Sequence, residues 1–301
     1  MRFITTNDLE DWAKRVDCKY NLPHLIRKLI LATVDLKEIK AIQFSYGEDV
    51  QTGGYDGELE TTCEKIFIPL GESVWEFGTT NNKKGKADED YEKRKQNPLD
   101  KNPSHVTYVN VNCKKYRDKK KWIGEKKKDN FWKDVRYLDA IDIEQWLELA
   151  PTVELWLAEK LKKPTLGIYT IEEYWKLWSE NETLKIIPEM LLGDSRVNEI
   201  EKVRSFVDNN EKALYIKSIT TDEAVAFPLA VFKSFDVLSE FEIVIIDNRE
   251  SFNLFIQSDK PLIIVAKFKL ESIDLNNATQ KNHKVIIPIS LADEIRSESK
   301  I

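Results

Sequence analysis

Two carboxylates, Asp56 and Glu76, are the residues of this sequence whose type and position most clearly suit catalysis or metal binding. Asp56 follows a predicted strand in the sequence GGYDG, and Glu76 lies within an otherwise apolar segment, VWEF, that predicts another strand. An acid in such a strand needs a compensating partner, because burying an unpaired charge is costly. A divalent cation shared with Asp56 would supply it, and carboxylate oxygens suit Mg²⁺ or Mn²⁺. Such a metal can activate water and neutralise charge that develops on a phosphodiester.

A charged segment that favours a helix, KADEDYEKR, follows this strand and could complete the site. Lys86, Asp90 and Arg94 are spaced i, i+4 and i+8, so they share one helix face with opposite charges adjacent. If the helix packs beside the strand at 73–79, Lys86 points at the attacking water or the scissile phosphate, and Asp90 and Arg94 hold it there. The same spacing is typical of a solvated helix face, so a purely structural role is the alternative.

A basic band covers residues 83–133, although the whole chain has a net charge of −6. The band holds 17 Lys and Arg against 8 Asp and Glu, which leaves −15 for the rest of the chain. Its densest part could hold a phosphate backbone without reading the sequence of bases, and the alternative is a solubilising loop. The candidate contacts are Lys114, Lys115, Arg117, Lys119, Lys120, Lys121, Lys126, Lys127 and Lys128, with Tyr116 and Trp122 interleaved.

The elements that would position these residues form an α/β sandwich over residues 1–163. A domain boundary near Pro164 is predicted because all eight tryptophans lie at or before Trp178, and Ile, Val and Leu dominate afterwards. Hydrophobic periodicity predicts helices at 7–17, 22–34, 86–95 and 141–161, the last being a helical pair. It predicts strands at 41–51, 65–70, 72–80, 105–111 and 134–140.

Residues 164–301 alternate buried apolar strands with helices, which predicts a second α/β domain with a mostly parallel sheet. Its beginning resembles a P-loop NTPase, but KSITTDEA stands where the phosphate-binding GxxxxGK[ST] loop is needed. Lys217 and Ser218 do not replace that loop, because no glycines allow the backbone to wrap a phosphate. Asp247, after the apolar run VIID, could imitate the acid that binds magnesium in such enzymes. The domain is therefore expected to be a degenerate, P-loop-like module for assembly or sensing.

The motifs of residues 1–163, taken together, resemble the PD-(D/E)xK restriction-endonuclease-like superfamily. GYDG, IPLGESVWEFGT, KADEDYEKR and the paired helices after LDA are similar to the nuclease-like N-terminal domain of large bacterial proteins in which an NTPase-type region follows. The resemblance implies that Asp56 and Glu76 are metal ligands and Lys86 the catalytic lysine, with Asp90, Tyr91 and Arg94 in support. Position 78, where the family carries its strand lysine, is glycine. The lysine would have moved to the helix, with Lys83 and Lys84 as competitors.

The resemblance implies a Mg²⁺-dependent (or Mn²⁺-dependent) deoxyribonuclease, the effector part of an anti-phage defence protein. DNA is the expected partner, with RNA as an alternative substrate. A catalytically inactive module for nucleic-acid binding or oligomeric assembly is the second hypothesis, since Gly78 replaces the usual lysine. We expect a homo-oligomer or further domains in a longer chain.

The composition limits other classes of protein. No run approaches the roughly 20 apolar residues of a membrane helix, and the first residues lack a signal-peptide pattern, so a cytoplasmic protein is expected. Three cysteines and three histidines without ligand spacing disfavour thiolate or imidazole metal sites.

Overall fold

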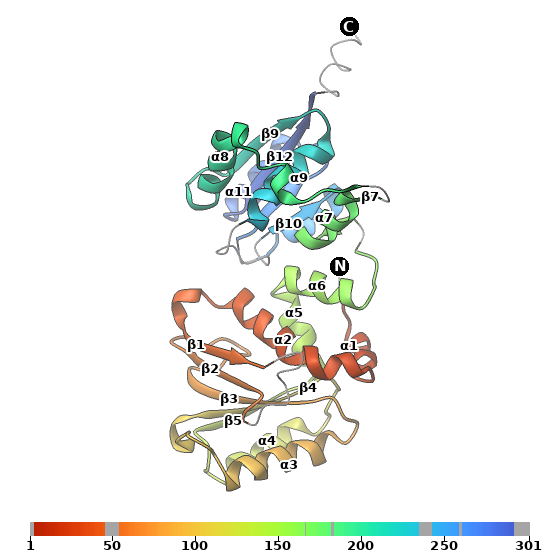
Figure 1. Cartoon of the computed structure of the whole chain (residues 1–301). Coiled ribbons are helices and arrows are strands. Elements are labelled where there is room, and N and C mark those ends of the chain that lie inside the picture. The colour runs from red at the N-terminus through yellow and green to blue at the C-terminus, as the bar shows by residue number, and fades with distance from the viewer. Residues whose placement is uncertain are drawn as a thin grey trace. The chain divides into compact units, whose positions relative to one another are not determined.

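The computed structural model describes residues 3–45, 54–165, 167–181, 184–234, 243–258 and 261–291, and divides the chain into two compact units, residues 2–157 and 158–301. The division falls within helix α6 (Pro151–Lys160), whereas the sequence predicted a boundary after residue 163. Each unit contains a mixed five-stranded sheet with helices, so the general α/β class is confirmed (Figure 1). None of the described helices combines the length and apolarity that crossing a membrane requires.

The first unit has the strand order β1-β2-β3-β4-β5. The strands β1, β2 and β3 pair antiparallel, whereas β3, β4 and β5 pair parallel. Its helices are α1 (Thr6–Trp12), α2 (Val16–Thr33), α3 (Lys83–Gln96), α4 (Lys119–Lys127), α5 (Ala140–Glu148) and the first part of α6, and its strands are β1 (Ile39–Phe44), β2 (Gly57–Thr61), β3 (Gly71–Gly78), β4 (Thr107–Asn112) and β5 (Asp134–Leu138).

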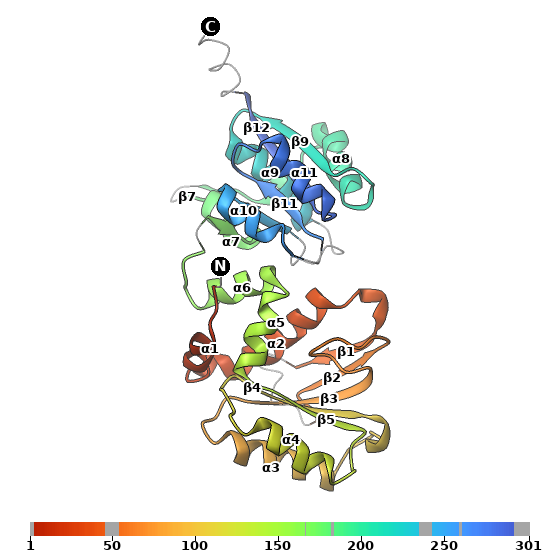
Figure 2. The same cartoon turned by 180° about the vertical axis from the view of Figure 1, so that it is seen from behind.

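Helices cover both faces of this sheet. Helices α3 and α4 lie on one face, and α1, α2 and α5 lie on the other (Figures 1 and 2). Aromatic side chains fill the layer between the sheet and the α3–α4 pair, where Tyr91, Tyr108 and Trp122 are fully buried. The ring of Tyr91 packs edge-on against both Tyr108 and Trp122, so α3 is held on β4 and beside α4. This packing gives the charged helix α3 a fixed position over the sheet.

Two sequence predictions about this unit were wrong. The segment 65–70 is not a strand and makes only one isolated bridge, between Lys65 and Ile68. The strand that precedes β3 and pairs with it is instead β2, in which buried and half-buried positions alternate along GELET because successive side chains point to opposite faces of the sheet. Helix α2 begins at Val16 and not at the predicted residue 22, so Pro23 lies well inside it.

The second unit has the strand order β6-β10-β11-β12-β9, in which only β6 runs antiparallel to its neighbour. The predicted mostly parallel sheet is confirmed, whereas β6 and α11 were not predicted. Its strands are β6 (Ile168–Tyr169), β7 (Glu180–Asn181), β8 (Leu184–Lys185), β9 (Ala213–Ser218), β10 (Ile243–Ile246), β11 (Ile263–Ala266) and β12 (Lys284–Ser290), and its helices are α7 (Ile171–Ser179), α8 (Val197–Asp208), α9 (Thr221–Lys233), α10 (Arg249–Phe255) and α11 (Ser272–Gln280).

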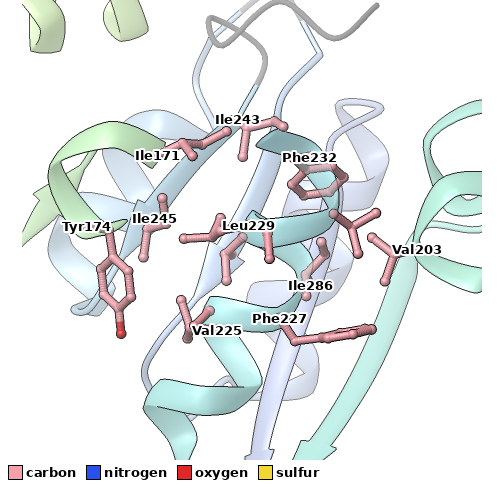
Figure 3. Packing of buried hydrophobic residues seen from close by; sticks show 14 of the residues in the cluster. Ile171, Tyr174, Val203, Val225, Phe227, Leu229, Phe232, Ile243, Ile245 and Ile286 are labelled. Carbon is pink, nitrogen blue, oxygen red and sulfur yellow. The ribbon is translucent and has the colours of Figure 1, made fainter. Parts of the chain in front are cut away.

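The order in which the chain connects the parallel strands of this unit explains on which face of the sheet α9, α10 and α11 lie. From β9, at one edge of the sheet, the chain passes over β12 and β11 to β10. The next two connections, to β11 and then to β12, run in the opposite direction along the sheet. Because such crossovers are right-handed, α9 lies on one face and α10 and α11 on the other (Figures 1 and 2). Figure 3 shows the core under α9, where Leu229 faces Ile245 and Ile286 of the sheet.

Candidate active site

Asp56 lies directly before β2, at the place where that strand begins to pair with β3. The sequence predicted that it follows a strand; the described part of β1 ends at Phe44, and residues 46–53 lie outside the described residues. Gly57 is opposite Trp75 in the antiparallel ladder. The carboxylate of Asp56 then accepts a hydrogen bond of 2.9 Å from the amide of Phe77. This bond ties Asp56 to the residue next to Glu76.

Glu76 is 5% exposed and lies on the face of β3 that α3 covers. Its carboxylate accepts a hydrogen bond from Nε of Arg94. Burial, with a further contribution from the charge of Asp56, raises the pKa of Glu76 to about 8, and Arg94 offsets only part of this rise. The buried acid therefore has a cationic partner within the fold, Arg94, whereas the sequence analysis assigned that part to a divalent cation.

This raised pKa predicts how the stability of the metal-free protein depends on pH. Glu76 binds its proton more tightly when folded than at the ordinary value of 4.5, so between about pH 4.5 and 8 the folded chain holds the extra proton. The free energy of unfolding should then fall as pH rises through this window, by at most about 1.4 kcal/mol per pH unit. Urea denaturation in EDTA should show this slope, and Glu76→Gln should flatten it. An unchanged slope in E76Q would refute the assignment.

Lys86 lies beside Gly78, the position to which the resemblance assigns a strand lysine. The side chain of Asn82 accepts a hydrogen bond from the amide of Gly85 and so starts α3 close to the end of β3. A Cβ atom placed on Gly78 would lie 3.6 Å from Cγ of Lys86. Lys86 thus occupies space into which a side chain at position 78 would extend, from the helix and not from the strand.

The Lys86 ammonium group forms an ion pair of 2.6 Å with Asp90. Burial by itself lowers the pKa of Lys86, but its hydrogen bond to Asp90 and the charges of neighbouring acids outweigh this and raise it. Lys86 is therefore a cation at neutral pH, suited to orient water or to stabilise negative charge and not to remove a proton. The competing lysines have other partners: Lys83 donates to the carbonyl of Lys115 at 2.8 Å, and Lys84 pairs with Asp88 at 2.5 Å.

Several polar residues missed by sequence reasoning line the same layer. Asn110 is opposite Glu76 and Asn112 is opposite Gly78 in the parallel ladder, and both are buried. The signal was present as two asparagines spaced by two within the apolar strand TYVNVN. Oδ2 of Asp90 and the hydroxyl of Tyr108 are buried and have no hydrogen-bond partner among the described residues.

The donor chemistry of this site fits a hard divalent cation. Burial, and after it the charge of Asp56, raises the pKa values of both Glu76 and Asp90, so the three carboxylates lie close enough to repel one another, and Asp90 keeps one oxygen without a hydrogen-bond partner among the described residues. In the described ranges, however, no group of three acidic, His or Cys residues is arranged to hold a metal. A metal held by Asp56 and Glu76 would complete its coordination with backbone oxygen or water, as Mg²⁺ commonly does.

The basic band is divided between lysines that pair with acids of the fold and exposed residues with fewer acidic partners. Lys119 pairs with Asp139 and Asp142 at 2.9 and 2.5 Å, and Lys127 pairs with Asp134 at 2.6 Å. Lys126 contacts Asp88 and Glu92 and lies over the ring of Tyr91. These three predicted nucleic-acid contacts thus have acidic partners within the fold.

Four other residues of the band are more accessible. Lys115, Arg117, Lys120 and Lys121 are exposed, and in the described ranges Arg117 and Lys120 form no ion pair. The aromatic residues of the band face inward: Trp122 is buried, and the ring of Tyr116 packs against Tyr137. They belong to the core and do not provide a stacking surface for bases.

In the second unit, Asp247 follows β10 and accepts hydrogen bonds from the hydroxyl of Tyr169, at 3.3 Å, and from the side chain of Asn248, at 3.0 Å. Strand β9 ends at Ser218, and the hydroxyl of Thr220 accepts a hydrogen bond that starts α9. Only Ile219 and Thr220 connect this strand to the helix, so the connection is shorter than a GxxxxGK[ST] loop.

No family model, curated protein or solved structure matches this chain.

Proposed function

We propose that the first unit is a metal-dependent nuclease that hydrolyses phosphodiester bonds of DNA. The observation that carries this proposal is the convergence of Asp56, Glu76 and Lys86 from three separate elements. One carboxylate precedes β2, the other lies within β3, and the lysine reaches from α3 to the space beside Gly78. Two acids and one ammonium group, placed together in a mostly buried layer, suit hydrolysis of an anionic substrate.

The chain's own residues would divide the work as follows. When bound, a Mg²⁺ or Mn²⁺ ion at Asp56 and Glu76 supplies a charge that neutralises the phosphodiester and acidifies water. Lys86 donates hydrogen bonds to the attacking water or to the phosphate oxygen on which charge develops. Asp90 keeps the ammonium group charged and oriented through its 2.6 Å contact. Burial of the carboxylates strengthens these interactions, because screening by solvent is weak there.

A plasmid-nicking assay tests this proposal directly. The purified chain is expected to relax supercoiled DNA with Mg²⁺ or Mn²⁺ and to be inactive in EDTA. Single-stranded DNA and RNA of the same sequence would establish the substrate class. Complete absence of nicking with both metals, in protein shown to be folded, would refute the nuclease assignment. The role as an effector in anti-phage defence remains a prediction from the resemblance.

A second candidate is a nuclease-like module that binds nucleic acid or assembles without cleaving. It is favoured by the engagement of Glu76 with Arg94 and by glycine at position 78. Tight DNA binding without nicking, or a stable homo-oligomer without nicking, would support this candidate. Size-exclusion chromatography with light scattering and a binding titration separate these two forms.

The exposed part of the basic band predicts electrostatic binding of DNA. Arg117→Glu together with Lys120→Glu should weaken binding to all DNA sequences alike and make the affinity less dependent on salt, by about one unit of log–log slope for each phosphate that is no longer neutralised. Fluorescence anisotropy at several salt concentrations measures this. Lys37→Glu together with Lys65→Glu, the same change in charge at two exposed residues outside the band, should leave binding almost unchanged. Equal effects of the band variant and K37E/K65E would contradict a local binding surface.

A further inference from the structure

We propose that Arg94 is a positioning residue that fixes the turn carrying Asp56 against the strand carrying Glu76. The inference deepens the proposed function and rests on it, because its purpose is to set the spacing of the two candidate metal ligands. The sequence predicted that Arg94 helps to hold Lys86. In the structure, Asp90 forms the ion pair with Lys86, and Arg94 pairs with Glu76.

Three contacts of one guanidinium group join the two segments. Nε of Arg94 donates to the carboxylate of Glu76, and Nη2 donates to the carbonyl of Gly54. The guanidinium carbon lies 4.5 Å from the centroid of the Tyr55 ring. Gly54 and Tyr55 are the two residues directly before Asp56. One side chain of α3 therefore grips both the strand residue and the turn.

The geometry of arginine matters for this role. Its planar guanidinium group offers donors in fixed, different directions and a face that stacks on an aromatic ring, whereas lysine presents a single ammonium group. Arg94 is 4% exposed, so its contacts are shielded from competing water. The turn also needs to be held: Gly54 has φ +131°, a backbone conformation that other residues rarely adopt.

The third link in this assembly is Asp56 itself. Its carboxylate accepts from the amide of Phe77, the residue that follows Glu76. The turn is thus attached to β3 at two points, through Arg94 on one side and through Asp56 on the other. Weakening the first attachment should loosen the second, because Asp56 is the residue next to Tyr55.

Arg94→Lys in the full chain tests this inference, with Arg136→Lys as the matched control. Arg136 lies in the same unit but pairs with Glu64 and Asp134, and not with a candidate metal ligand, so its replacement should leave the site unchanged. The first measurement is hydrogen–deuterium exchange of the metal-free protein. R94K should speed exchange at residues 54–56 and at Phe77 by about tenfold or more, without a matching increase in β5. The second is Mn²⁺ titration by calorimetry, in which the Mn²⁺ concentration at half-saturation should rise about tenfold in R94K. In the nicking assay, high Mn²⁺ should then partly restore cleavage by this variant.

The outcomes separate this inference from the proposed function. Unchanged exchange and unchanged Mn²⁺ half-saturation in folded R94K would overturn the positioning role. If R94K shows faster exchange at the turn but the wild-type protein neither binds Mn²⁺ nor cleaves DNA, the positioning role of Arg94 would stand and the nuclease proposal would be refuted. If R94K does not fold, Tyr55→Leu removes the stacked ring while keeping both donors of Arg94. The Tyr55→Leu variant should then increase exchange at the same residues by less than the tenfold expected for R94K. An unchanged exchange rate in Y55L would count against the inference.

Discussion

Cleavage of supercoiled DNA is expected to fall by about a thousandfold or more when Asp56 is replaced by asparagine or Glu76 by glutamine. A bound metal contributes several kcal/mol of charge stabilisation to such a reaction, and each 1.4 kcal/mol corresponds to about a tenfold change in rate. Both replacements keep the shape of the side chain and put a neutral amide in place of a carboxyl group that can bind the metal as a carboxylate. The loss should therefore follow from weaker metal binding and not from altered packing.

Glu72→Gln provides the matched control for these variants. Glu72 lies on the same strand, β3, but its carboxylate pairs with Lys101 at 2.8 Å and its side chain is 41% exposed. E72Q should retain wild-type cleavage, whereas D56N and E76Q should lose it at a given Mg²⁺ concentration. A single-turnover nicking assay measures the rates, and circular dichroism verifies the fold. Full activity of E76Q would remove Glu76 from the mechanism.

The sequence predicted that the three candidate residues Asp56, Glu76 and Lys86 come together, because their positions follow from local rules. An acid in an apolar strand marks a buried charge, and a helix that starts only a few residues after the strand must pack back near it. The structure supports this prediction: Lys86 lies beside Gly78, and the charge of Asp56 is felt at Glu76. Such short-range relations can be predicted from spacing alone.

The partners of the charged residues could not be predicted in the same way. The spacing of α3 identifies the face that Arg94 shares with Lys86, but not the residue it meets, which depends on the turn before β2. Counting lysines in the basic band treats each as available, whereas Lys119 is neutralised by Asp139, 20 residues away. Residues far apart in sequence are brought together only by the packed fold.

The position of Lys86 predicts that the lysine can be moved to the strand. Lys86→Ala alone should reduce cleavage by about a hundredfold to a thousandfold, the usual effect of removing one preorganised electrostatic group. Adding Gly78→Lys to this variant should recover at least about tenfold of the missing rate, since a side chain at position 78 would extend into the space that Lys86 leaves. Gly78→Ala with Lys86→Ala is the control that adds a Cβ without an ammonium group.

The local geometry permits this exchange. Gly78 is not among the described glycines with positive φ, so an L-residue is tolerated there by the backbone. Its new Cβ would lie 2.8 Å from Nδ2 of Asn112, the end of a side chain that can shift. Lys84→Ala, which removes an exposed lysine of the same helix, should change cleavage little. If K84A loses as much activity as K86A, or if G78K/K86A cleaves no faster than G78A/K86A, then the ammonium group beside Gly78 is not what the reaction requires.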